Sequence, residues 1–60
     1  MYEKYAAIRD AKGMTDYAVA KASGIGASTF SDWKNSRSKP KLEKLLKIAA
    51  VLGVKIEELI

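Results

Sequence analysis

The positions of the chain breakers constrain this sequence more than any other feature. All four glycines and the single proline fall where they divide the 60-residue chain into short segments. The breakers are Gly13, Gly24, Gly26, Pro40 and Gly53. Within the segments, apolar residues recur three and four positions apart, and β-branched residues do not alternate along them. The sequence therefore predicts an all-α, compact domain of five short helices and no strands.

The expected helices follow from propensity, capping residues and periodicity. They run from about Tyr2 to Lys12, from Asp16 to Ala22 behind the N-cap Thr15, from Ala27 to Lys34, from Lys41 to Leu52, and from Val54 to Ile60. The fourth has the clearest apolar stripe. Its members are Leu42, Leu45, Leu46, Ala49 and Leu52. In the third, Phe30 and Trp33 share one face. We expect Trp33 to pack in the core, against the last two helices, rather than to stack on single-stranded nucleic acid.

Length and composition limit both the architecture and the chemistry. Sixty residues form one domain, 1–60, and a chain of this size buries only about 60% of its unfolded surface. With no cysteine and no histidine, disulfides and the usual metal sites are ruled out, so helix packing, with dimerisation as a possible addition, must hold the fold. General acid-base and nucleophilic catalysis also lack their usual residues. We therefore predict no enzyme activity and no cofactor.

Positive charge is concentrated in the second half of the chain. The formal net charge is +4, and the central basic residues are Lys34, Arg37, Lys39, Lys41, Lys44 and Lys47. Within that stretch the only acid is Glu43. Such a stripe is typical of a phosphate-facing surface, and equally of a solvated helix face. No apolar run reaches the length of a membrane span and the first residues do not form a signal peptide, so the expected location is the cytoplasm.

Two short helices around one glycine form the most specific pattern in the chain. Ala20 is small enough for a second helix to pack across the first, and Gly24, four positions later, suits a tight turn. Ile25 and Phe30 are placed to enter the core, and Asn35 is expected to end the second helix. This arrangement predicts two helices packed across each other.

The segment from Asp16 to Asn35 resembles the helix-turn-helix of the phage Cro and CI repressors and of their bacterial relatives, the Xre-like regulators. The resemblance extends to Lys12–Thr15, Trp33–Pro40, Leu45–Ala49 and Leu52–Val54. It implies a lambda-repressor-like fold with the helix-turn-helix at helices 2 and 3. It also implies a sequence-specific regulator of transcription, a Cro-like repressor that places Ala27–Lys34 in the major groove of double-stranded DNA.

The resemblance assigns roles to individual positions. Base contacts fall on Gly26, Ala27, Ser28 and Asp32. Among their side chains, Asp32 would accept from the amino group of cytosine. Phosphate contacts fall on Asp16, Thr29, Ser31, Asn35, Arg37, Lys39 and Lys41. Phosphate contacts position a protein on DNA without reading its sequence.

Three positions depart from the family pattern. Asp16 stands where the family commonly has glutamine, so its carboxylate suits a structural role at a helix start, with phosphate left to the backbone amides. Ser36 stands where glycine is frequent. Lys34 replaces the acid that pairs with an arginine at position 9 in some relatives. That pair cannot form here, which leaves Arg9 for phosphate, another acid or solvent.

The last segment suggests how two copies associate. A homodimer, at least on DNA, is expected through Val54, Ile56, Leu59 and Ile60. Ile56 and Leu59 could instead close the core of the monomer. The same fold also serves as a protein-interaction module, such as an antitoxin or anti-repressor, and the sequence leaves that alternative open.

Overall fold

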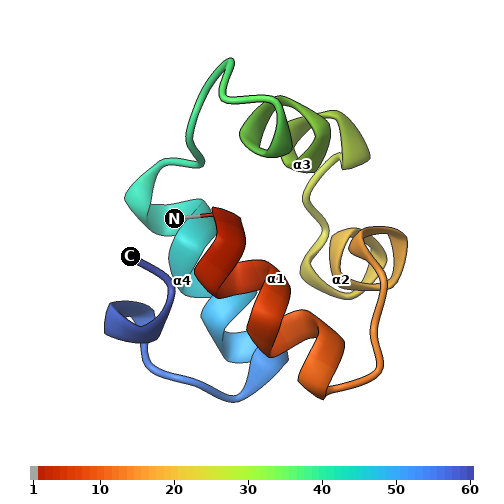
Figure 1. The fold of residues 1–60 in the computed structure, drawn as a ribbon, viewed down its shortest axis with the longest axis vertical. Helices are drawn as coiled ribbons and strands as arrows, with labels where there is room; N and C mark the ends of the chain where they lie inside the picture. The colour runs from red at the N-terminus through yellow and green to blue at the C-terminus, as the bar shows by residue number, and fades with distance from the viewer. Residues whose placement is uncertain (1) are drawn as a thin grey trace.

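The computed structural model describes residues 2–60 and contains four α-helices followed by one 3-10 turn, with no strand in that range. The elements are α1 (Tyr2–Ala11), α2 (Asp16–Ser23), α3 (Ala27–Lys34), α4 (Leu42–Leu52) and η1 (Ile56–Glu58). The second helix packs against both α3 and α4, and η1 packs against α4 (Figure 1). The predicted all-α architecture is confirmed.

The ends of α2 and α4 are fixed by capping residues. Thr15 caps α2 by accepting a hydrogen bond of 3.1 Å from the amide of Ala18. Gly24 and Gly53 end α2 and α4 with φ of 75° and 69°, the left-handed conformation that glycine adopts without a steric penalty. The connections after α2 and α4 therefore begin at the two glycines where the sequence predicted that the helices end.

The fifth helix expected over Val54–Ile60 is not an α-helix. Only a three-residue 3-10 turn forms there, at Ile56–Glu58. The amide of Glu58 donates to the carbonyl of Lys55 at 3.0 Å and that of Leu59 to the carbonyl of Ile56 at 2.9 Å, which is the tighter bonding of a 3-10 turn. Leu59, which is fully buried, holds the segment to the core instead.

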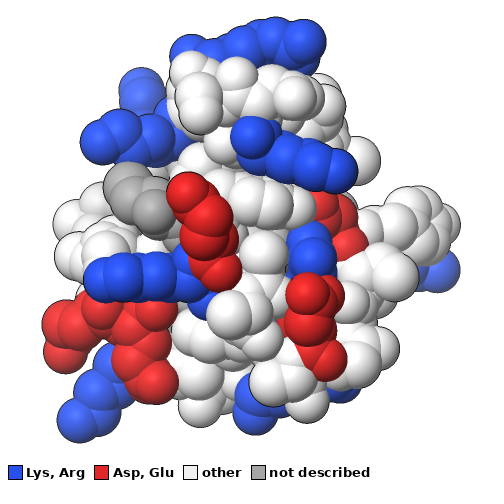
Figure 2. All heavy atoms as spheres, viewed as in Figure 1, with Lys and Arg blue, Asp and Glu red and all other residues white. Residues whose placement is uncertain are grey.

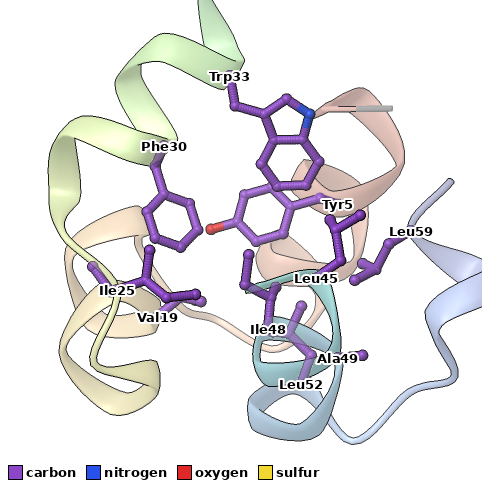
Figure 3. Close-up of a cluster of buried hydrophobic side chains, with 11 residues drawn as sticks. Tyr5, Val19, Ile25, Phe30, Trp33, Leu45, Ile48, Ala49, Leu52 and Leu59 are labelled. Carbon is purple, nitrogen blue, oxygen red and sulfur yellow. The ribbon is translucent and has the colours of Figure 1, made fainter. Parts of the chain in front are cut away.

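An aromatic cluster lies at the centre of the core (Figure 3). Trp33 stacks on Tyr5 with 4.9 Å between ring centroids, and Tyr2 meets Trp33 edge-on at 5.5 Å. Phe30 lies 5.6 Å from Tyr5. Trp33 is thus a core residue, as predicted. Its ring–ring contacts are made with α1, a helix that the sequence analysis did not offer as its partner.

The buried stripe of α4 differs from the predicted one at three positions, because it includes Ile48 and leaves out Leu42 and Leu46. Leu45, Ile48, Ala49 and Leu52 are buried, and they keep the three- and four-residue spacing of a helix face. Leu42 and Leu46, expected to face inward, are 65% and 50% exposed. Because the stripe is centred on Leu45 and Ile48, Leu42 and Leu46 lie at its edge. Leu42 is also in the first turn of α4.

Leu59 cannot serve in a dimer surface, because none of it is exposed. Val54 and Ile56 are partly buried against the same core. Ile60 remains 50% exposed, and its backbone oxygen accepts a hydrogen bond of 2.7 Å from Nζ of Lys4. Of the four residues expected to form the dimer patch, Leu59 closes the core of the monomer, which was the alternative left open for it.

Candidate nucleic-acid interface

The turn between α2 and α3 is built from the residues that the sequence pattern singled out. Val19 and Ala20 are buried on the inner face of α2. The amide of Gly24 donates to the carbonyl of Ala20 at 3.0 Å. Ile25, directly after the turn, is buried, and Phe30 anchors α3 in the same core. The turn therefore fixes the direction in which α3 leaves the core.

The third helix has one face in the core and one in solvent. Phe30 and Trp33 are its buried residues. Ala27, Ser28 and Ser31 are exposed, and all three have short side chains. The first turns of α3 can therefore approach a partner closely, because no exposed residue of the helix before Lys34 has a long side chain.

The four predicted base-contacting residues occupy the start of α3 and one position a turn further along the same helix. Gly26, Ala27 and Ser28 are exposed together at the start of α3. Asp32 lies further along the helix, and its Oδ1 is 3.3 Å from Nη1 of Arg37. The carbonyl of Asp32 also accepts from the amide of Arg37 at 2.8 Å. Asp32 is thus joined to the connection after α3 by both its backbone and its side chain.

The basic residues predicted to contact phosphate lie in and after the connection between α3 and α4. Arg37, Lys39 and Lys41 are exposed, and Lys and Arg side chains gather over this connection at the top of the view in Figure 2. Asn35 donates from Nδ2 to the carbonyl of Ser31 at 2.9 Å, which closes the end of α3. Thr29 is half-buried.

The connection after α3 contains an unusual backbone conformation at Ser36. Its φ is +59°, and among residues 2–60 no other non-glycine residue has a positive φ. The resemblance marked this position as one where glycine is frequent, and serine bears the steric cost of the positive φ here. Pro40, buried at the far end, anchors the connection to the body.

Asp16, at the start of α2, is enclosed by donors from α1. Its carboxylate accepts from the hydroxyls of Tyr5 at 2.7 Å and Tyr2 at 2.8 Å, and from Nη1 of Arg9 at 2.7 Å. Arg9 also pairs with Asp10 at 2.8 Å. Of the alternatives left open for Arg9, which were phosphate, another acid and solvent, the structure shows contact with another acid, Asp16. We call Tyr2, Tyr5, Arg9 and Asp16 the α1–α2 polar cluster.

Protonation of this cluster follows from its contacts. Partial burial acts to raise the pKa of Asp16, but the hydrogen bonds from Tyr5, Arg9 and Tyr2 outweigh it and leave that pKa below its usual value. Burial, together with the hydrogen bond to Asp16, raises the pKa of Tyr5. The cluster therefore holds one carboxylate, one guanidinium and two neutral phenols at neutral pH.

This arrangement bears on the phosphate contact predicted for Asp16. Its carboxylate already accepts three hydrogen bonds, and a carboxylate repels phosphate, so any contact at this position falls to the backbone of the first turn of α2. The structural role predicted for the side chain has a concrete form. Asp16 joins the helix-turn-helix to α1.

Two aspects of this surface were not predicted from the sequence. The tyrosines of the α1–α2 polar cluster were not recognised as partners of Asp16, although Tyr2, Tyr5 and Arg9 recur three and four positions apart on one helix face. Tyr17 was not singled out either. It is 70% exposed on the first turn of α2, and an aromatic ring with that much exposure is a candidate contact.

Other kinds of site find no support in the part of the chain that the structure describes. Nowhere in residues 2–60 do three or more Asp, Glu, His or Cys side chains converge as metal ligands would. None of the helices described here has the length and apolar character needed to cross a membrane.

Comparison with known proteins gives one match. A sequence profile for the family described as "Helix-turn-helix" matches residues 6–59, nearly the whole chain. No curated protein matches. No solved structure matches either.

Proposed function

Because this chain belongs to the Cro/CI-type (Xre-like) helix-turn-helix family, a family of DNA-binding regulators, we propose that it is a Cro-like repressor of transcription. In this proposal α3 enters the major groove of double-stranded DNA. The cations after α3 neutralise phosphates, and occupancy of the operator excludes polymerase. Such a protein acts in the cytoplasm.

One observation carries this proposal. The exposed start of α3, at Gly26, Ala27 and Ser28, has only short side chains, and the exposed cations Arg37, Lys39 and Lys41 follow its other end. A helix with short side chains can lie close to the floor of the groove while the cations beside it neutralise phosphates. Affinity in the proposal comes mainly from the cations.

Sequence recognition comes from fewer groups. The Ala27 methyl suits a thymine methyl, and Ser28 donates or accepts at a base edge. The carboxylate of Asp32 pairs with Arg37. To accept from a cytosine amino group, it must either bind both groups at once or break the pair with Arg37. Because no arginine or glutamine stands among these residues, DNA shape contributes strongly to specificity.

One recognition helix buries little DNA surface, so the proposed active form is a dimer on half-sites about 34 Å apart. With Leu59 in the core, the contact between copies falls to Ile60 and the exposed parts of Val54 and Ile56.

The salt dependence of binding to random duplex DNA tests the proposal. Fluorescence anisotropy across a series of salt concentrations should give a linear log-log plot with a slope of roughly −0.9 per neutralised phosphate. Selection from random duplexes then gives the operator. If no binding appears at low salt, the proposal is wrong.

A protein-interaction module of the same fold, such as an antitoxin or anti-repressor, is the second candidate. The observation that favours it is the pair of exposed leucines on α4, Leu42 and Leu46, at 65% and 50% exposure. They lie one turn apart and so form a continuous apolar strip. A protein without DNA affinity that forms a stable complex through this strip would support the second function.

A further inference from the structure

A pocket of about 730 Å³ lies between the start of α1 and the connection from α3 to α4. Tyr2 and Glu3 line it from α1, and Trp33 and Lys34 from the end of α3. The connection contributes the rest, from Ser36 to Lys39. Its size is within the range of small-molecule sites, which are usually formed before the ligand binds.

The indole of Trp33 gives this pocket an unsatisfied donor. Trp33 is only 3% exposed, and its Nε1 is a buried polar atom with no hydrogen-bond partner. Figure 3 shows this nitrogen on the edge of the ring that points away from Phe30, toward the start of α1. Buried polar groups are nearly always paired, so an unpaired one in a residue that lines a pocket calls for an acceptor.

Positive charge surrounds the same pocket. Three lining residues are cationic, namely Lys34, Arg37 and Lys39, and Glu3 is the acid among them. Ser36 and Ser38 add hydroxyls that can donate to an anion. The ring of Tyr2 stands edge-on to Trp33, so the wall between them is aromatic. The chemistry combines an aromatic wall with anion-binding groups.

We propose that this pocket binds a small aromatic anion, a carboxylate or phosphate monoester on a flat ring. The ring lies against Tyr2 and the small exposed part of Trp33, and the anionic group faces Lys34, Arg37 and Lys39. An acceptor atom of the ligand satisfies Nε1 of Trp33 once the side chains that screen this nitrogen from water give way slightly.

Occupancy of the pocket is coupled to DNA. This part of the inference rests on the proposed function, because Arg37 and Lys39 line the pocket and also belong to the phosphate-contacting set. A ligand that holds these two cations removes them from the DNA backbone. The bound anion therefore weakens DNA binding and acts as an inducer.

Ligand binding is tested first without DNA, by NMR. The chain has a single tryptophan, so one indole N–H signal reports on the pocket. The probes are phenyl phosphate, inorganic phosphate as an anion without a ring, and benzyl alcohol as a ring without charge. We expect phenyl phosphate to move the indole signal in a saturable way and to bind at least tenfold more tightly than inorganic phosphate. Benzyl alcohol should leave the signal in place.

Two variants locate the site. Lys34→Gln should weaken phenyl phosphate binding at least threefold. Lys12→Gln, at an exposed lysine in the turn after α1 that does not line the pocket, should not change it. Equal binding of phenyl phosphate and inorganic phosphate would mean a simple phosphate site and overturn the proposal. An unmoved indole signal, or equal binding by both variants, would overturn it as well.

The coupling is measured separately, as the DNA affinity of the wild-type protein with and without saturating phenyl phosphate. We expect a loss of at least threefold. Unchanged affinity with the ligand bound would overturn the inducer role alone. Absence of DNA binding would overturn the proposed function but leave the NMR result standing.

Discussion

Nη1 of Arg9 lies 2.7 Å from Oδ1 of Asp16, which joins the last turn of α1 to the first turn of the helix-turn-helix. The acid from another helix that pairs with Arg9 is therefore on α2. The end of α3 has Lys34, which cannot form such a pair. Arg9 holds α1 to the helix-turn-helix through Asp16.

Asp16→Asn should therefore destabilise the protein. It removes a charge that accepts three hydrogen bonds and leaves the partly covered guanidinium of Arg9 with the exposed carboxylate of Asp10 and the neutral hydroxyl of Tyr2, at a cost of about 1–3 kcal/mol. Asp10→Asn is the matched control, because Asp10 is 68% exposed in its pair with Arg9 and such pairs contribute about 0–1 kcal/mol. Urea unfolding measures both. Equal losses in the two variants would contradict the role given to Asp16.

The same carboxylate predicts how stability changes with pH. The folded pKa of Asp16 is lowered, so the unfolded chain, with a pKa of about 3.9, takes up this proton first as the pH falls. The contribution of Asp16 is fully present above about pH 5 and is lost as the pH falls through the folded pKa. Wild type and Asp16→Asn should differ in free energy of unfolding at about pH 7 and converge toward about pH 3. A difference that stays constant would rule out this titration as the cause.

Ser36→Gly should stabilise the protein. Ser36 has φ +59°, a conformation that costs a non-glycine residue roughly 1–2 kcal/mol. Glycine removes this cost. It also makes the unfolded chain more flexible, which lowers the stability of the folded state by about 0.5–1 kcal/mol. The expected net gain is about 0.5–1 kcal/mol in thermal or urea unfolding. Gly24→Ala is the opposite control: φ is +75° and an added Cβ meets no atom within 4 Å, so only backbone strain acts and the variant should lose stability.

The sequence predicted the scaffold better than the surface. Ala20, Gly24, Ile25 and Phe30 were correctly placed because turn chemistry and packing are local and follow residue spacing. The α1–α2 polar cluster could not be predicted, because Asp16 meets Tyr2, Tyr5 and Arg9 only after α1 and α2 have packed. Leu42 and Leu46 belong to an apolar run whose inward direction depends on the other helices. The contacts of each residue with DNA remain predictions.

Phosphate and base contacts can be separated by two substitutions. Lys39→Ala should weaken binding to all duplexes about equally and reduce the salt slope by roughly 1, because one phosphate contact is lost. Asp32→Ala should change the preference at one base pair while releasing Arg37. The affinities of both variants for the selected operator and for its single-base variants distinguish a phosphate contact from a base contact. Unaltered preference in Asp32→Ala would show that Asp32 only holds Arg37.

Leu59 and Ile60 are adjacent in sequence, yet the structure predicts opposite consequences for their substitution. Leu59→Ala opens a cavity at a fully buried side chain and should cost about 2–5 kcal/mol in the free energy of unfolding. Ile60→Ser, at a half-exposed position, should change monomer stability by less than about 0.5 kcal/mol. Analytical ultracentrifugation with and without operator DNA then tests the dimer. Ile60→Ser should weaken association on DNA, because this side chain is the most exposed part of the proposed contact. Unchanged association would place the contact between copies elsewhere, with Leu42 and Leu46 as the next surface to test.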